Sequence, residues 1–202
     1  MIEFKNFYAR FVKDFYSVFD ANFSINSHSI LIEKNPCGNI AIFRTVSKIF
    51  SGYDGDVFID EKNLKSINKK DLDIVYLPEN PVLFTFKSIK YNLSFPLKIR
   101  KINKKIIKNH VNSVFFQYNL NNFKKKINKL SLSEKKIITL IRSLIRKPKY
   151  ILLENFFENL EEKHISLALE ILQEIKQYSM IIISEKNEEN FKYFPDFKRI
   201  EI

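Results

Sequence analysis

The chain has 202 residues, of which 45% are hydrophobic and 28% are charged, and its formal net charge is +11. This composition is typical of one folded domain and excludes an extended disordered chain. No run of about 18 apolar residues occurs, which excludes a membrane-spanning helix, and the single cysteine, Cys37, excludes an internal disulfide or a thiolate metal site.

The first half of the chain contains mainly predicted strands. Alternating or continuous apolar residues predict strands at Ile2–Lys5, Phe15–Ile25, Ser29–Ile32, Val57–Asp60 and Asp73–Leu77. A loop, EKNPCG, follows the third of these strands, and a helix is expected from about Asn39 to Ile49.

The second half alternates predicted helices with apolar strands. Lys87–Lys129 has helical character, with a helix around Asn103–Tyr118 that carries Ile106, Ile107, Val111 and Val114 on one side. Ser131 and Glu134 form a capping-box pattern at the start of a helix that ends before Pro148. The strand Tyr150–Glu154, the helix Glu162–Lys176, the strand Met180–Ser184 and a last strand within Phe197–Ile202 complete the prediction. Fully apolar strands between helices predict a parallel α/β sheet.

Charge is unevenly distributed along the chain. Residues 1–86 have 10 basic and 11 acidic residues, residues 87–149 have 18 and one, and residues 150–202 have 6 and 11. The middle segment therefore has a net charge of +17, which fits a phosphate-bearing partner, an anionic membrane surface or a solvated lysine-rich face. Phe115, Phe116, Tyr118 and Phe123 in this segment have the spacing of core residues rather than of a stacking platform for bases.

Ligands of a parallel sheet bind beyond the carboxyl ends of its strands, and the segments in these places are similar to a known family. LSLSE stands in the place of a LSGGQ signature, SLIRKPKYILLE and FFENLE resemble the following helix, Walker B strand and D-loop, and DIVYLPENPVLF fits a Q-loop region. In this order, the segments resemble the nucleotide-binding domain of ATP-binding cassette (ABC) transporters over nearly the whole chain. The resemblance implies a P-loop NTPase-like parallel core sheet with an N-terminal antiparallel β portion and an inserted helical subdomain at about 87–147, all in one domain, 1–202.

The phosphate-binding loop departs from that family. The family loop, G-x-N-G-x-G-K-[ST]-T, cradles phosphates with backbone N–H groups, neutralises them with its lysine and holds magnesium with its hydroxyl. Here Asn39 replaces the lysine, Ile40 replaces the hydroxyl residue, Pro36 removes an N–H donor and Glu33 adds a negative charge. The resemblance places the nucleotide-binding positions at Asn35, Cys37, Gly38, Asn39, Ile40 and Ala41, with Phe11 as the adenine-stacking aromatic and Ser131 as the signature serine.

The catalytic positions are substituted as well. Glu154 stands in the place of the Walker B aspartate, and Asn155 in the place of the glutamate base, where an amide cannot take a proton from water. Glu79 replaces the Q-loop glutamine and Glu185 the switch histidine, while Leu132 and Ser133 replace the signature glycines. Because the loop lacks the lysine and the hydroxyl that meet phosphate and magnesium, we expect weak or no binding of ATP and Mg²⁺ and no resident metal. Losses from a concerted site also abolish most of its rate.

These residues predict a degenerate, non-hydrolysing ABC subunit with a structural or regulatory role. The resemblance implies a transmembrane permease as a partner, a homodimer or heterodimer with another ABC subunit, and a cytoplasmic location at the inner face of a membrane, where an anionic surface is a further partner. Three alternatives remain open: a weakly active ATPase with unusual ligands, a basic nucleic-acid-binding module, and the product of a decaying gene.

Overall fold

The computed structural model describes residues 1–12, 15–32, 37–120 and 126–202. Contacts divide the chain into two compact units. The first unit contains Met1–Tyr76, Lys149–Asn155 and Met180–Ile202, and the second contains Leu77–Pro148 and Phe156–Ser179. The expectation of a single domain with a helical subdomain at 87–147 stays a prediction, and each unit is described below by itself.

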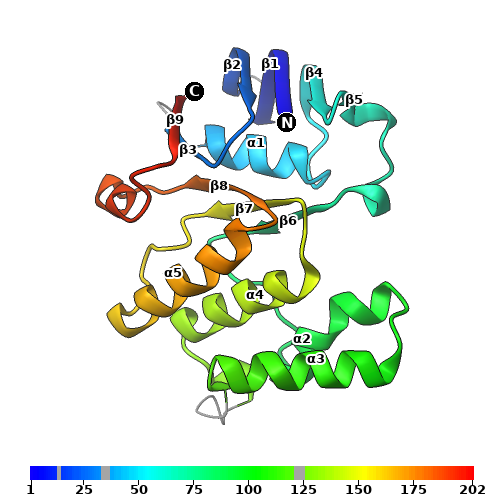
Figure 1. Cartoon of the computed structure of the whole chain (residues 1–202). Helices are drawn as coiled ribbons and strands as arrows, with labels where there is room; N and C mark the ends of the chain where they lie inside the picture. Colours follow the sequence, from blue (N-terminus) through cyan, green and yellow to red (C-terminus); the bar gives the residue numbers. More distant parts are fainter. Residues whose placement is uncertain (13–14, 33–36, 121–125) are drawn as a thin grey trace. The chain divides into compact units, whose positions relative to one another are not determined.

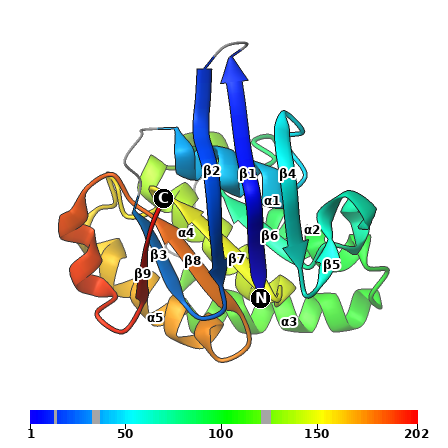
Figure 2. The same cartoon turned by 90° about the horizontal axis from the view of Figure 1, so that it is seen from above.

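An antiparallel sheet begins the first unit. Its strand order is β2-β1-β4-β5, and Figure 2 shows β1 and β2 as a long hairpin beside β4. Gly55 in β4 has φ +84°, and a Cβ there would lie 1.9 Å from the carbonyl oxygen of Asn6, so the two strands approach closely only with glycine. The strands are β1 (Ile2–Val12), β2 (Phe15–Ile25), β4 (Tyr53–Ile59) and β5 (Lys62–Asn63).

The predicted parallel core sheet is confirmed. Five strands lie in the order β6-β7-β8-β3-β9, and β3 is parallel to both β8 and β9, as β7 is to β8. The residues expected in this sheet, 29–32, 74–77, 150–153 and 180–183, all lie in it. Its strands are β3 (Ser29–Ile32), β6 (Ile74–Leu77), β7 (Tyr150–Glu154), β8 (Met180–Ser184) and β9 (Lys198–Glu201).

Helix α1 (Gly38–Val46) joins the two sheets of the first unit into one core. It contacts β1 and β2 of the antiparallel sheet and β7 of the parallel sheet, and it lies between them in Figure 1. Ala41, Ile42, Phe43 and Val46 are buried there. The core therefore fixes the first turn of α1 beside the carboxyl ends of the parallel strands.

Two predictions for the first unit are wrong in detail. The first strand continues to Val12 rather than ending at Lys5, because it pairs with β2 and β4. In the predicted strand Phe15–Ile25, Phe19 shares the alternate spacing of Ala21, Phe23 and Ile25, which predicts that it lies on their face, yet it is 74% exposed. The register shifts between the pairs Phe7–Ala21 and Ala9–Val18, so an extra residue of β2 turns Phe19 outward.

The second unit is helical in its described residues. Ser88 caps α2 and Asn103 caps α3 by accepting from backbone N–H groups, and α4 packs against α2, α3 and α5. Ile137, Ile138, Ile141, Leu144 and Ile145 are all buried on α4, as their spacing predicts. The α-helices are α2 (Ile89–Ile99), α3 (Lys104–Gln117), α4 (Leu132–Arg146) and α5 (Glu162–Lys176). A short 3₁₀ turn lies at Ile127–Lys129 in this unit, and others lie at Leu64–Ser66, Lys69–Asp71 and Glu188–Tyr193 in the first unit.

Two aromatic or apolar side chains of α3 do not belong to the core. Phe116 is 83% exposed and Ile106 is 58% exposed, whereas Ile107, Val111 and Val114 are buried. The apolar stripe of α3 is therefore narrower than predicted. Ile106 lies one position before the buried Ile107 and Phe116 lies two positions after the buried Val114, so at about 3.6 residues per turn both point away from the buried side. Phe123, also expected in the core, lies outside the described residues.

Candidate functional site

The described part of the phosphate-binding loop is the N-terminus of α1. Cys37 is exposed and is the N-cap of this helix, but its side chain makes no capping hydrogen bond. Gly38 and Ala41 are buried and Ile40 is half-buried. Glu33, Lys34, Asn35 and Pro36 lie outside the described residues, as does the side chain of Phe11, whose backbone belongs to β1.

Asn39, which stands at the lysine position, is bonded into the protein core. Its side chain is 1% exposed, and its amide nitrogen donates to the carbonyl oxygen of Leu31 at 3.1 Å and to Ser184 Oγ at 2.9 Å. Because Leu31 belongs to β3 and Ser184 ends β8, the amide joins the ends of two parallel strands to α1. The residue that would meet a phosphate in the family serves here as a structural link.

Glu154, the last residue of β7, is also engaged within the first unit. It is 5% exposed, and its carboxylate accepts a hydrogen bond from the Tyr76 hydroxyl on β6. A charged carboxylate that accepts from a tyrosine in a buried setting is stabilised by that bond. Tyr76 therefore holds the side chain at the Walker B position against the sheet.

Asn155 and Glu185 follow the ends of β7 and β8 and are both buried. Asn155 has φ 44°, a conformation that asparagine tolerates better than most residues. Its N–H donates to the carbonyl oxygen of Ser184 at 2.7 Å, and its Oδ1 accepts from the N–H of Lys186 at 3.0 Å. Glu185 accepts from the Asn190 amide at 3.2 Å.

These residues form one group at the carboxyl ends of the parallel strands, called the strand-end cluster below. Its members are Asn39, Glu154, Asn155, Ser184 and Glu185. The cluster has two carboxylates, two amides and one hydroxyl, whereas the family pattern has a lysine, a hydroxyl and a glutamate base. Among the described residues, no group of three or more His, Cys, Asp or Glu side chains is placed to hold a metal ion. The cluster does not fit a magnesium nucleotide, because none of its side chains is a cation and its hydroxyl, Ser184 Oγ, accepts from the Asn39 amide.

Ser131 belongs to the second unit and caps α4. Its Oγ accepts from the N–H of Glu134 at 3.1 Å, while the Glu134 carboxylate accepts from the N–H of Ser131 at 2.7 Å, so both halves of the predicted capping box are present. Ser131 Oγ also donates to the Glu161 carboxylate at 2.9 Å. Two carboxylates of the chain itself thus contact the serine at the N-terminus of this helix.

A buried polar pair includes Ser133, in the first turn of the same helix. Ser133 Oγ accepts from the N–H of Glu161 at 3.0 Å and lies 2.6 Å from His164 Nδ1. Burial lowers the pKa of His164, which favours the neutral imidazole, and the Ser133 hydroxyl and Nδ1 share one hydrogen bond. Ser133, which replaces a signature glycine, therefore ties α4 to α5. Glu79, at the Q-loop position, is half-buried in the second unit.

Sequence reasoning missed the partners that complete these contacts. Ser184, Tyr76 and His164 each bond directly to one of the substituted positions. The signal for Ser184 was a polar residue that ends the apolar run MIII, and the signal for Tyr76 was a hydroxyl within the buried strand IVYL. Neither signal indicates which neighbour is bonded, because that depends on strand order.

Comparisons with known proteins agree on one family. The family model described as "ABC transporter" matches residues 18–157. The sn-glycerol-3-phosphate import ATP-binding protein UgpC of Bordetella avium (strain 197N) is 25% identical over 146 residues, which are 71% of this chain and 40% of that protein. The chain therefore aligns with well under half the length of this relative.

A solved structure shows the same fold. It is a dimeric ATP-binding cassette in a post-hydrolysis state, bound to ADP and phosphate, and it superposes with a TM-score of 0.81 at 14% identity. The match covers 96% of this chain and 91% of the other. Within the part of the chain that the structure describes, no helix is both long enough and apolar enough to cross a membrane.

Proposed function

Since the chain belongs to the ABC transporter family as a nucleotide-binding domain, we propose that it is a non-hydrolysing subunit of a transporter complex. Members of this family bind ATP and Mg²⁺ and pair with transmembrane permeases. In this subunit the role is structural or regulatory: it occupies the place of an ATPase subunit without turning over nucleotide.

The main support for the proposal is the burial of the Asn39 side chain and its bonding within the protein. A loop that binds ATP must stabilise the roughly four negative charges of its phosphates with N–H donors, a cation and a metal. The amide of Asn39 instead donates to Leu31 and Ser184, and it is buried. Loss of one charge-assisted hydrogen bond costs about 1.5–3 kcal/mol, which is roughly a 10- to 150-fold loss of affinity.

The other substituted positions support the same proposal. Asn155 supplies no base, and its amide oxygen already accepts from the backbone of Lys186. At the N-terminus of α4, the Glu134 and Glu161 carboxylates contact Ser131, so a phosphate brought there by another subunit meets like charges. The substitutions therefore remove nucleotide ligands both at the strand-end cluster and at the N-terminus of α4, the two surfaces that bind nucleotide in the family.

The proposed partners are a transmembrane permease and a second ABC subunit with intact motifs. A subunit without a base or a metal hydroxyl contributes no complete site of its own, so a heteromeric pair is favoured over a homodimer. Such a complex places the chain in the cytoplasm at the inner face of a membrane. The net charge of +17 in residues 87–149 suits the anionic surface found there.

Phosphate release by the pure chain tests the proposal. We expect no magnesium-dependent release above that of Glu154→Gln, a variant that keeps an oxygen acceptor for Tyr76 and serves as the contamination control. Turnover by the native chain that Glu154→Gln abolishes would instead identify a working ATPase with unusual ligands.

A further inference from the structure

A groove of about 690 Å³ lies between α2 and α3 in the second unit. Three apolar side chains line it: Ile102, Ile107 and Val111. Four lysines line it as well: Lys90, Lys98, Lys104 and Lys108. Its volume falls within the range of about 300–1,000 Å³ that is usual for small-molecule sites. An apolar surface among cationic side chains matches a ligand that is both apolar and anionic.

The positive charge of the groove is not neutralised by acidic side chains. Within the described residues, none of its four lysines forms an ion pair. Lys104 and Lys108 are four residues apart on α3, where like charges repel. The one acid of residues 87–149, Glu134, is engaged in the capping box of α4. An anion in the groove would therefore relieve repulsion between side chains already present.

Local contacts orient two of these lysines. Lys90 Nζ donates to Asn112 Oδ1 at 3.0 Å, and Lys98 Nζ lies 4.3 Å from the ring centre of Tyr91. Tyr91 also lines the groove, and Lys87 lies over its ring at 5.5 Å. Because this ring is already in contact with two ammonium groups, it is a poor platform for stacking a base, which disfavours nucleic acid as the occupant.

We propose that the groove between α2 and α3 binds the headgroup of an anionic phospholipid, with the phosphate among its lysines and the first apolar atoms of the lipid on Ile107 and Val111. This proposal rests on the proposed function in one respect, which is that the chain is located at a membrane. It does not depend on whether the chain binds or hydrolyses nucleotide.

Vesicle sedimentation of the full chain tests the groove. We expect binding to vesicles that contain phosphatidylglycerol and not to pure phosphatidylcholine. Each lysine near an anionic surface contributes about fivefold in affinity, so the triple variant Lys98→Gln, Lys104→Gln, Lys108→Gln should bind about 100-fold more weakly. A matched variant removes three lysines of the same segment that do not line the groove: Lys101→Gln, Lys105→Gln, Lys129→Gln. It should lose only a few-fold, and an equal loss in both variants would overturn the inference.

A second pair of variants changes the shape of the groove without changing its charge. Asn112 lines the groove and is exposed, so Asn112→Trp should fill it and weaken vesicle binding about tenfold. Ser113, its exposed neighbour outside the groove, provides the control Ser113→Trp, which should bind normally. Binding unaffected by Asn112→Trp, or tighter binding to RNA than to phosphatidylglycerol vesicles, contradicts the proposal. Phosphate release remains a separate measurement, so failure here leaves the non-hydrolysing role untouched.

Discussion

Asn39 shows how a polar side chain at the N-terminus of α1 can link two strands inside the core. Lysine carries a charge on a longer side chain, whereas asparagine is neutral and short enough to donate to Leu31 and Ser184 inside the core. A buried side chain with partners on two strands contributes to stability rather than to ligand binding. Restoring the family residue therefore has a structural cost.

The variant Asn39→Lys should lower the free energy of unfolding by about 1–3 kcal/mol, because it removes two buried hydrogen bonds. It should not produce turnover, since Asn155 still supplies no base and Ile40 no hydroxyl. Urea unfolding and phosphate release measure the two effects, with Asn39→Leu as the uncharged control. Native stability together with new ATPase activity in Asn39→Lys would show that the site is one substitution away from function.

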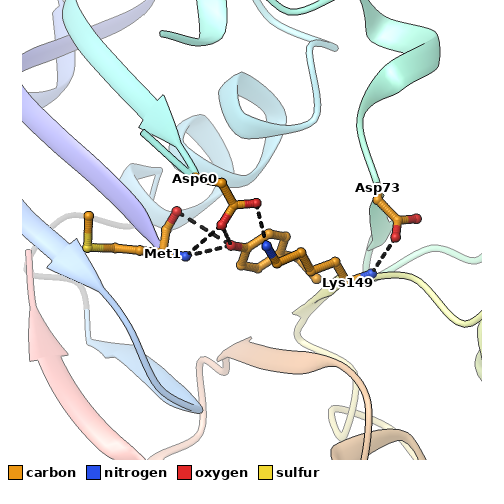
Figure 3. Close-up of polar contacts among 5 residues, drawn as sticks. Met1, Asp60, Asp73 and Lys149 are labelled. Atoms are coloured by element: carbon orange, nitrogen blue, oxygen red, sulfur yellow. Dashed lines mark hydrogen bonds and ion pairs between the residues drawn. The ribbon is translucent and has the colours of Figure 1, made fainter. Parts of the chain in front are cut away.

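Asp60 lies in a separate polar network of the first unit (Figure 3). Its carboxylate accepts from Lys149 Nζ at 2.7 Å, from the Tyr150 hydroxyl at 2.6 Å and from the Met1 ammonium at 3.0 Å. The backbone N–H of Lys149 donates to Asp73 at 3.0 Å. Burial by itself raises the pKa of Asp60, but the three donors outweigh it and lower the pKa to about 2.

This pKa predicts a specific loss of stability in acid. An aspartate with a lowered pKa stabilises the folded state above its unfolded pKa of about 3.9, and that contribution disappears as the pH falls towards 2. Because Asp60 is 39% exposed, we expect only about 1 kcal/mol at pH 7. Urea unfolding of the native chain and Asp60→Asn should differ by this amount at pH 7 and converge near pH 2. A difference in the free energy of unfolding that stays constant from pH 7 to pH 2 would contradict the lowered pKa of Asp60.

The sequence located the substituted residues at the strand ends but did not predict their contacts. The sequence places three polar residues after apolar strands, at positions given by the resemblance to the family motifs: Asn39, Asn155 and Glu185. Their bonding partners could not be placed in this way, because Ser184 meets Asn39 only when β8 lies beside β3. That adjacency depends on strand order, which local sequence does not encode.

Lys136 determines how α4 holds the segment that follows the Walker B strand. It is 1% exposed, and its ammonium donates to the carbonyl oxygens of Phe156 at 3.1 Å and Glu158 at 2.7 Å. A buried charge with such partners is expensive to disrupt because the carbonyl groups lose their donor. We therefore expect this contact to anchor the D-loop region to the helix.

The variant Lys136→Met keeps the length of the side chain and removes its donors. It should lower the free energy of unfolding by about 2–4 kcal/mol. Lys135→Met, at the half-buried neighbouring position, provides the control and should change stability by less than about 0.5 kcal/mol. Urea unfolding with the same probe measures the free energy of unfolding of both variants. Equal losses in the two variants would show that Lys136 does not anchor the segment after β7.

Elements with strong periodicity were predicted closely, and irregular ones were not. The helix Glu162–Lys176 and the strand Met180–Ser184 have the predicted bounds. Helix α2 was not separated from its surroundings, because Pro96 lies inside it and proline normally ends a helix. Leu93 and Leu97 are buried on α2, which packs against α4, and this burial outweighs the lost hydrogen bond.

At the scale of the whole chain, the fold is retained while the residues that need charge or a proton acceptor are replaced. The apolar strands of the parallel sheet and the stripe of α4 remain buried. Core positions require only apolar side chains of suitable size, so they are predictable from sequence and tolerant of change. Catalytic positions require particular atoms, and one replacement among them removes a function without unfolding the protein.

Calorimetric titration of the pure chain with ATP in the presence of Mg²⁺ tests directly whether the chain has a working nucleotide site. We expect no saturable heat at micromolar ATP, because Asn39 and Ile40 offer neither the cation nor the hydroxyl that the family uses. Asn39→Leu should give the same result as the native chain. A dissociation constant in the micromolar range for the native chain, lost on removal of Mg²⁺, would contradict the account and show a working nucleotide site.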